Sequence, residues 1–181
     1  MPPHSIQKSS RSVMRLRETD APDPEDFEAN VRWLRDREQI KNLYGRYAFG
    51  VDSRDFDLVR SVFHPDCEVV GTLEEGTLDD YLSGIEEAIE QWETTMHFMG
   101  NQYIELDGDK GHVETWVLGY HMEADDSPID HLILGLRYED DVVRVGDDWK
   151  IIRRETAKQW HTGPFPRPTI GPPIYPRSNR N

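Results

Sequence analysis

Cysteine is almost absent from this sequence of 181 residues. The one cysteine, Cys67, has no partner for a disulfide within the chain and cannot by itself build a thiolate metal cluster. The N-terminal segment also lacks the apolar core that a secretory signal contains. We therefore expect a reducing compartment and predict a cytoplasmic location.

Long apolar runs and positive charge are also scarce. No apolar stretch approaches the roughly 18 residues that a membrane-spanning helix needs. The 21 Lys and Arg residues against 35 Asp and Glu residues give a net charge of -14, which disfavours attraction to phosphate backbones and anionic lipid. We expect neither nucleic acid nor a membrane as a partner. The apolar residues, 36% of the chain, suffice for one core but not for two, so we predict one domain.

The short motifs that mark metal, nucleotide and acyl-enzyme sites are missing. Despite seven histidines, the sequence has no His-Glu-x-x-His helix, no paired cysteines and no calcium loop. It also has no Gly-x-Gly-x-x-Gly pattern, no phosphate loop and no serine in a nucleophile elbow. We expect a protein without a bound metal or cofactor.

The two ends of the chain differ from the middle in composition. Residues 1–22 are polar and unperiodic, and we predict a flexible arm there. Residues 161–181 contain eight prolines and glycines, which exclude a helix or a central strand. This tail also holds apolar residues, so we expect it to lie over a neighbouring subunit or a pocket mouth. The folded domain is predicted to span residues 23–160.

The first half of that domain has helical periodicity. Asp23-Pro24 is typical of a helix start, and apolar residues at spacings of three and four continue to about Val51. A short second helix follows, for which the pattern predicts an end at His64-Pro65. Asp79 can cap a third helix, which carries apolar residues on one side as far as Trp92.

The second half has the period of two that is typical of strands. After a short strand at residues 67–70, longer strands are predicted at 95–106, 112–123, 131–138 and 149–156, with turns between them. Helices followed by an antiparallel meander indicate the α+β class. Three helices can cover only part of a strongly curved sheet, so we expect a cone-shaped α+β barrel whose open end is a cavity.

Four segments together resemble the SnoaL-like branch of the nuclear transport factor two-like superfamily. They are IKNLYGRYAFGVD at 40–52, VFHPDC at 62–67, MHFMGN at 96–101 and DDWKI at 147–151. The resemblance covers residues 34 to 160. Within this branch the sequence is similar to the group that contains scytalone dehydratase, bile-acid 7α-dehydratase and hexachlorocyclohexane dehydrochlorinase. These enzymes eliminate water or halide from an alicyclic ring with a histidine and an aspartate and without a metal.

The resemblance implies catalytic roles for three residues. Tyr47, Asp52 and His97 match the tyrosine, aspartate and histidine of the bile-acid enzyme, and the last two match the dyad of the dehydrochlorinase. His97 is then the base, Asp52 holds it in one tautomer, and Tyr47 or Tyr44 donates a hydrogen bond to an oxygen of the substrate. The arginine or lysine that some relatives add has no clear counterpart here.

Each of these residues also has a purely structural interpretation. Asp52 can simply begin the turn that follows the first helix, where aspartate is common. His97 has apolar neighbours and can be a satisfied core histidine. Tyr44 and Tyr47 lie on an apolar helical stripe, where core packing explains them adequately.

Four further residues are candidates for contact with the substrate: Tyr44, Asn101, Trp116 and His131. Asn101 lies four residues after His97 and shares its strand face if no bulge intervenes. His121 and His131 flank a predicted turn and can project either into the cavity or, as we favour from the pattern, out to water. His64 is interpreted as part of a helix stop, and Cys67 as core filling.

The sequence thus predicts a cofactor-independent lyase of the dehydratase type that acts on a hydrophobic cyclic polyketide, steroid or terpenoid. An isomerase or cyclase is the near alternative, because proton abstraction beside a carbonyl begins both reactions. The other alternative is a protein that binds a small ligand without chemistry. Strands that are apolar on both faces predict a homo-oligomer, with a trimer favoured by the resemblance and a dimer as the second choice.

Overall fold

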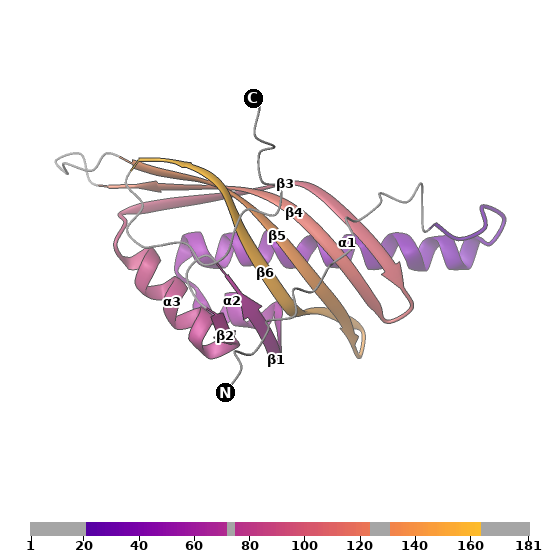
Figure 1. Cartoon of the computed structure of the whole chain (residues 1–181). Helices are drawn as coiled ribbons and strands as arrows, with labels where there is room; N and C mark the ends of the chain where they lie inside the picture. The colour runs from indigo at the N-terminus through magenta and orange to yellow at the C-terminus, as the bar shows by residue number, and fades with distance from the viewer. Residues whose placement is uncertain (1–20, 72–74, 124–130, 164–181) are drawn as a thin grey trace, which may run out of the picture.

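The computed structural model describes residues 21–71, 75–123 and 131–163, which form three helices and six strands (Figure 1). The helices are α1 (Phe27–Ser53), α2 (Phe56–Ser61) and α3 (Leu78–Glu90). The strands are β1 (Phe63–Val70), β2 (Glu75–Thr77), β3 (Thr94–Asp107), β4 (Lys110–Met122), β5 (His131–Val145) and β6 (Asp148–Thr162). The α+β class is confirmed. The predicted arm at 1–22 and tail at 161–181 lie almost wholly outside the described residues, as does the predicted turn at 125–128.

The long helix α1 begins and ends with recognisable caps. The side chain of Asp26 accepts a hydrogen bond from the main chain of Ala29 at the N-terminus. At the C-terminus, Arg54 adopts the left-handed conformation, with φ of 59°. With 27 residues the helix is about 40 Å long. None of the described helices combines the length and the apolar composition that crossing a bilayer requires.

The two shorter helices differ in detail from the sequence prediction. Helix α2 starts at its cap Asp55 and ends at Ser61, before the predicted stop, so that His64 and Pro65 lie in β1. The strand tolerates this proline because its pairing with β6 is irregular between Phe63 and Glu68. Helix α3 is capped by Thr77, not by Asp79 as predicted.

Thr77 caps α3 because it forms a capping box. Its hydroxyl accepts a hydrogen bond from the main chain of Asp80, and the Asp80 carboxylate accepts one from the main chain of Thr77. This reciprocal pair satisfies two main-chain donors, whereas an isolated aspartate cap satisfies one. Asp79 instead lies in the first turn, where its charge suits the helix dipole.

The six strands form one sheet with the order β2-β1-β6-β5-β4-β3. The antiparallel meander from β3 to β6 agrees with the prediction. The sheet is nevertheless mixed, because β1 runs parallel to β6. Alternation of apolar residues specifies the faces of a strand but not its direction beside a distant partner, so this pairing escaped the sequence pattern.

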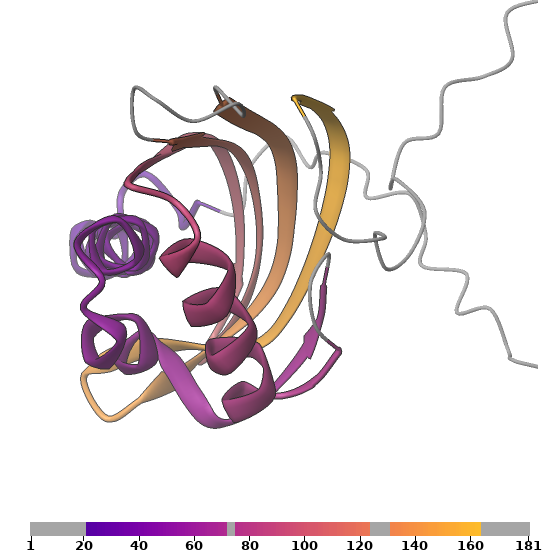
Figure 2. The same cartoon turned by 90° about the vertical axis from the view of Figure 1, so that its left-hand side faces the viewer.

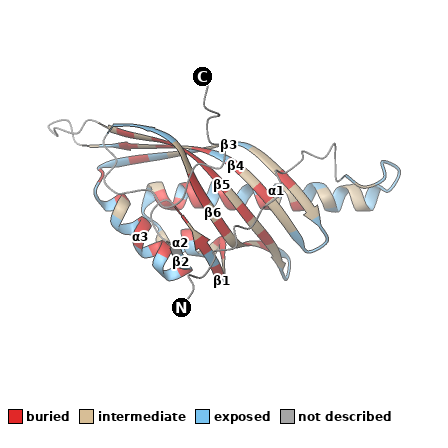
Figure 3. Cartoon of the chain, in the orientation of Figure 1, coloured by how far each residue is buried: buried red, intermediate tan, exposed pale blue. Residues whose placement is uncertain are grey.

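All three helices lie on the concave side of the curved sheet (Figure 2). The buried residues gather between these two layers (Figure 3). Along β4 the odd-numbered residues Val113, Val117 and His121 are buried toward the helices, whereas Trp116 and Met122 are exposed on the outer face. The concave side therefore holds both the core and the cavity described below.

Candidate active site

The side chains of Asp52 and His97 meet where the end of α1 packs on the start of β3. The Nδ1 atom of His97 lies 2.7 Å from Oδ1 of Asp52. The main-chain N–H of His97 donates a hydrogen bond to Oδ2 of the same carboxylate at 2.7 Å, and the Thr95 hydroxyl donates one to Oδ1 at 2.9 Å. Both oxygens of Asp52 therefore accept hydrogen bonds from β3.

The position of Asp52 in the last turn of α1 explains why it needs these donors. The helix dipole places partial negative charge at this end, and α1 has no basic residue in its last turn. Burial by itself raises the pKa of Asp52, but hydrogen bonds from the ring and main chain of His97 and from Thr95 outweigh it. The pKa of Asp52 is held below its ordinary value of 3.8, so the group is a carboxylate at neutral pH.

The contact with Asp52 also fixes the tautomer of His97. A carboxylate can only accept a hydrogen bond, so Nδ1 of the imidazole carries the proton. The other ring nitrogen, Nε2, is left with a lone pair, and His97 lines the cavity on the concave side of the sheet. The side chain is only 6% exposed, which shields this lone pair from bulk water. The arrangement provides an oriented base.

The cavity beside His97 has a volume of about 70 Å³. Its apolar wall is formed by α3, through Ile85, Ala88 and Ile89, and by Leu134 and Leu136 of β5. Its polar groups are imidazole, phenol and hydroxyl groups, and no Lys, Arg, Asp or Glu is among the described residues that line it. The cavity is therefore suited to an uncharged ligand.

His121 is the second histidine of the cavity. Its ring lies 5.5 Å from the ring of His97 in an edge-to-face arrangement, and its Nδ1 lies 3.3 Å from the carbonyl oxygen of Leu132. Burial, together with the neighbouring His97, lowers the pKa of His121 to about 4, so it is neutral at pH 7. The pattern favoured a position at the surface. His121 is in fact buried, because it shares its strand face with Val113 and Val117.

Gly119 leaves room for the two imidazole rings. It is the partner of His97 in the pairing of β3 with β4. A methyl group built on Gly119 would lie 3.2 Å from Cε1 of His121 and 3.5 Å from Nε2 of His97. A larger side chain at this position would therefore crowd both rings.

Three tyrosines, Tyr47, Tyr81 and Tyr138, form the phenolic part of the cavity lining. The oxygens of Tyr47 and Tyr81 are 3.0 Å apart, and Nη1 of Arg154 donates a hydrogen bond to the oxygen of Tyr81 at 3.3 Å. Burial raises the pKa of both phenols well above 10, so both remain protonated. Since the Tyr81 oxygen accepts from Arg154, its own proton can be donated to Tyr47. Tyr47 is also hydrogen-bonded to Tyr138, so the Tyr47 proton reaches a ligand oxygen only when the ligand takes the place of Tyr138 as its acceptor.

Arg154 is itself fully buried and paired with Asp140. Its Nε and Nη2 atoms donate hydrogen bonds to the two carboxylate oxygens of Asp140 at 3.0 and 2.8 Å. The guanidinium also lies over the rings of Tyr138 and Tyr47, at 4.1 and 4.5 Å from their centroids. The positive charge therefore lies directly behind the phenols of the cavity.

None of the four predicted substrate contacts is among the residues that line the cavity. Tyr44 is buried in the core, where its hydroxyl donates a hydrogen bond to Asp140 at 2.9 Å. Asn101 is exposed, because the register of β3 against β4 shifts between Met99 and Gln102. This is the bulge on which the prediction for Asn101 depended.

Trp116 and His131 lie on the outer face of the sheet. Trp116 is 42% exposed and follows the alternation of β4, on which Val117 points inward. His131 pairs with Met122, another outer-face residue of β4, whereas its neighbour Leu132 is buried. A period of two assigns alternate residues to two faces but does not tell which face holds the cavity.

Sequence reasoning missed Arg154 as a residue near the site. Side chains alternate between the two faces of a strand, and Trp149 and Ile151 point inward. An unbroken alternation would therefore turn Arg153 inward and Arg154 outward. The pairing of β6 with β5 shifts at this point, since Asp141 faces Arg153 while Val142 faces Ile151. The extra residue reverses the faces and buries Arg154. In the sequence, two arginines stand side by side here, and their order alone does not tell which of them is buried.

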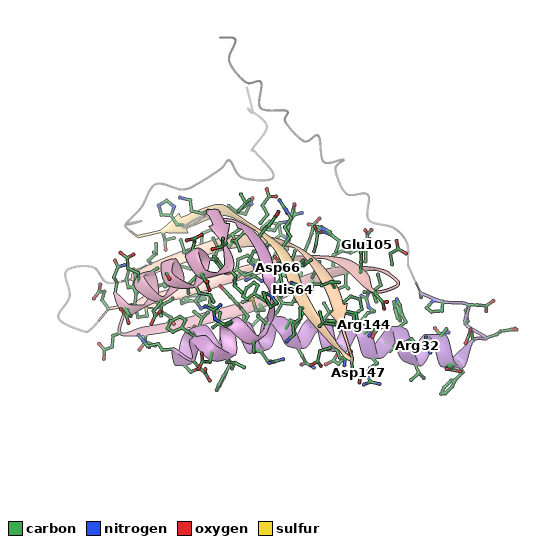
Figure 4. All side chains as sticks on the ribbon, turned by 90° about the horizontal axis from the view of Figure 1, so that it is seen from below. Arg32, His64, Asp66, Glu105, Arg144 and Asp147 are labelled. Atoms are coloured by element: carbon green, nitrogen blue, oxygen red, sulfur yellow. The ribbon has the colours of Figure 1, made fainter. Side chains whose placement is uncertain are left out.

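The remaining histidines of interest lie outside the cavity. His64 and Asp66 lie beside each other on β1, where Nδ1 of His64 accepts a hydrogen bond from the main chain of Asp66 (Figure 4). His112 contacts Asp141 on the strand pair β4–β5 at 2.9 Å. Within the described parts of the chain, no three His, Cys, Asp or Glu side chains are grouped so that they could hold a metal ion.

Comparison of sequences places this chain beside a known domain family and two relatives. A family model described as the SnoaL-like domain matches residues 32–155. An uncharacterized protein of Mycobacterium tuberculosis is 32% identical over 142 residues, a match that covers 71% of this chain and 89% of the relative. A protein of Mycobacterium bovis, also uncharacterized, gives the same values.

Solved structures share the fold. A crystal structure from Novosphingobium aromaticivorans, provisionally named a scytalone dehydratase, is 26% identical with a TM-score of 0.69, over 82% of this chain and 97% of that chain. The type 3 hexachlorocyclohexane dehydrochlorinase of Novosphingobium barchaimii is 19% identical with a TM-score of 0.61, over 79% and 99% of the two chains. The match of the family model over residues 32–155, together with the relative that is 32% identical, establishes that the chain belongs to the SnoaL-like domain family.

Proposed function

We propose that this protein is a cofactor-independent lyase that eliminates water or a similar leaving group from a small, hydrophobic cyclic molecule. The single observation that carries the proposal is the contact of 2.7 Å between Asp52 and His97, with Nε2 of His97 on the side of a shielded cavity. Likeness to a protein provisionally named a scytalone dehydratase and to a dehydrochlorinase supports the reaction class.

In the proposed reaction, Nε2 of His97 takes a proton from a carbon next to an activating group. The electron pair of the broken C–H bond forms the new C=C bond, and the C–O bond to the leaving hydroxyl breaks. The imidazolium returns its proton to the departing oxygen, so that water leaves and His97 ends neutral. Asp52 keeps the proton on Nδ1 and stabilises the imidazolium while it exists.

The phenols of Tyr47 and Tyr81 supply the hydrogen bond that this reaction needs at an oxygen of the substrate. Their protons remain in place at neutral pH, because burial raises the pKa of both. The buried Arg154 donates to Tyr81 and so strengthens the pair as a donor. In this role Tyr47 polarises the carbonyl that activates the C–H bond.

The lining of the cavity restricts the substrate. The volume of about 70 Å³ is roughly half of the ~150 Å³ at which an engineered apolar cavity takes up benzene. A single ring is therefore admitted only when side chains of the α3 wall move outward. The absence of charged side chains from the described lining favours an uncharged substrate over a carboxylate or an ammonium.

An isomerase is the second candidate, and the phenol pair is the observation that favours it. A hydrogen bond from Tyr47, supported by the one that Tyr81 donates to Tyr47, suits an enolate oxygen, and an enolate can be reprotonated at another carbon without loss of a leaving group. Product mass separates the two reactions: elimination lowers the mass by that of water or hydrogen halide, whereas isomerisation leaves it unchanged.

The test begins with the ligand that the purified protein carries, identified by mass spectrometry, and with a panel of hydroxylated cyclic ketones. Turnover is followed by the mass of the product in the wild type, His97→Gln and Asp52→Asn. We expect His97→Gln to lower kcat by about 10²- to 10⁴-fold. Asp52→Asn should lower it by up to about 10⁴-fold, because an amide can donate to Nδ1 and reverse the tautomer.

His64→Gln serves as the control, since His64 lies on β1 outside the cavity and should keep full turnover. Undiminished turnover in His97→Gln would remove the base from the mechanism. Tight binding of a ligand that the wild type never converts would instead identify a binding protein.

A further inference from the structure

Arg54 joins the two elements that carry Asp52 and His97. It follows the last residue of α1, and its Nη2 donates hydrogen bonds to the carbonyl oxygens of Trp92 and Glu93 at 2.6 and 3.2 Å. These two residues immediately precede Thr94, the first residue of β3. Arg54 therefore ties the end of α1 to the start of β3, next to the dyad.

The backbone of Arg54 is held in an unusual conformation. Its φ of 59° lies in the left-handed region, and it is the only residue other than glycine with a positive φ in the described parts of the chain. Glycine or asparagine is the usual choice at such a helix end, because a β-carbon is strained there. Arg54 is exposed, so packing in the core does not explain why an arginine occupies this position. Its hydrogen bonds to the segment before β3 offset the strain.

The dyad depends on the distance between these same two elements. Asp52 accepts hydrogen bonds from Thr95 and from both the ring and the main chain of His97, all on β3. Another tie between α1 and β3 runs from Arg37 to the carbonyl oxygen of Ile104, 17 residues earlier on the helix. That is about 25 Å along the axis, too far to fix the end of α1.

We propose that Arg54 is a positioning residue, which holds the end of α1 against the start of β3 so that the Asp52 carboxylate meets Nδ1 of His97. The inference rests on the proposed function, because the importance of this contact follows from the role of His97 as a base. Arg54 acts through geometry: its guanidinium binds main-chain carbonyls and not Asp52. Without it, the carboxylate and the imidazole are no longer kept in one relative position.

The test reads the state of His97 directly and needs no substrate. In the full-length protein labelled with ¹⁵N and ¹³C, ring ¹⁵N shifts give the tautomer of His97, and the carboxyl ¹³C shift gives the titration of Asp52. The wild type should show one tautomer, with the proton on Nδ1. In Arg54→Met and Arg54→Gly the ring shifts should move toward averaged values, and the pKa of Asp52 should rise toward 3.8 as its donors are lost.

The two variants separate the side chain from the backbone. Arg54→Met keeps the strained φ and loses the donors, whereas Arg54→Gly loses the donors and relieves the strain. Equal loss of the tautomer signature in both assigns the effect to the hydrogen bonds. Arg54→Lys retains a donor group at nearly the same length and should recover most of the wild-type signal. With a converted substrate, Arg54→Met should lower kcat by about 10- to 100-fold with little change in KM.

Arg46→Ala is the matched control, because Arg46 also lies on α1 and donates to the Ser61 hydroxyl at 2.7 Å, linking α1 to α2 and not to β3. It should leave His97 unchanged, and hydrogen-exchange protection of β5 verifies that every variant is folded. A wild-type tautomer and Asp52 titration in folded Arg54→Gly and Arg54→Met would overturn the inference. That result would not affect the proposed function, which is tested by the turnover of His97→Gln.

Discussion

The two histidines of the cavity differ in what their Nδ1 atoms contact. Nδ1 of His97 meets the carboxylate of Asp52, whereas Nδ1 of His121 meets the carbonyl oxygen of Leu132. A carboxylate stabilises a protonated ring, but a carbonyl alone does not offset the cost of burying its charge. His97 can therefore take up a proton during a reaction, while His121 remains a neutral wall of the cavity near pH 7.

His121 should make the stability of the fold dependent on pH. Its pKa is about 4 in the folded protein against an ordinary value of 6.5, so the unfolded chain binds more protons between these values. The free energy of unfolding should therefore fall, on the order of 3 kcal/mol, as the pH is lowered from about 6.5 to about 4. Urea unfolding of the wild type and of His121→Gln across this range measures the effect.

The variant should lose most of this slope, whereas His64→Gln should keep it, because His64 lies outside the cavity. An unchanged slope in a folded His121→Gln would assign the acid sensitivity to other groups. Asp52 does not cause a loss of stability between pH 6.5 and pH 4. Its pKa is lowered in the folded protein, so the stability that it contributes is lost only below about pH 4.

At the scale of elements, α1 packs tightly against α2 at Gly50. A β-carbon on Gly50 would lie 2.8 Å from Cγ2 of Val59 and 3.0 Å from the carbonyl oxygen of Asp55. The main chains of the two helices therefore approach each other here without a side chain between them. Asp52 lies two residues later, so this contact also influences where the end of α1 points.

Two glycines on α1 provide a matched test of that contact. Gly50→Ala should lower the free energy of unfolding by about 1–3 kcal/mol, because the added methyl overlaps α2. Gly45→Ala meets nothing within 4 Å and should raise it by about 0.5–1 kcal/mol through helix propensity alone. Chemical denaturation of both variants decides the matter. Equal changes of the same sign would mean that α2 yields freely to the methyl group.

The elements were predictable from local pattern wherever the pattern is unbroken. The helical stripe on α1, the period of two in β3 to β6 and the pairing of Asp52 with His97 could be anticipated from residues and from resemblance. The bulges could not, because an extra residue in one strand depends on the partner strand. Asn101 was therefore misplaced by one reversal of faces, and Arg154 was not recognised as a residue near the site.

At the scale of the whole molecule, the outer face of the sheet carries large apolar side chains that no described part of the chain covers fully. They come from three strands: Met96 and Phe98 of β3, Trp116 and Met122 of β4, and Trp160 of β6. Phe98 is 61% exposed and Met96 is 53% exposed. Exposed apolar side chains gathered on one face of a sheet commonly serve in association.

We propose that the protein is a homo-oligomer that associates through this outer face, with a trimer favoured over a dimer. Sedimentation equilibrium should give a multiple of the chain mass of 21.1 kDa. Phe98→Glu should shift the protein toward single chains, because a buried unpaired carboxylate is costly. Phe49→Glu is the control, since Phe49 is 67% exposed on α1 and not on the sheet. A wild-type mass equal to one chain would exclude the proposal.

The dyad is shared between α1 and β3, which come together only in the folded domain. A chain in which α1 has detached from the sheet still contains both side chains, yet its imidazole has no fixed tautomer and its cavity has lost a wall. The fixed tautomer of His97 should therefore report on the docking of α1, and on heating its ring ¹⁵N signature should be lost before the sheet unfolds or together with it. If the chain is expressed as two fragments divided at residues 72–74, Asp52 and His97 lie on different fragments. The imidazole should then regain a fixed tautomer only when the fragments reassemble, so the contact between the two side chains reports on tertiary structure.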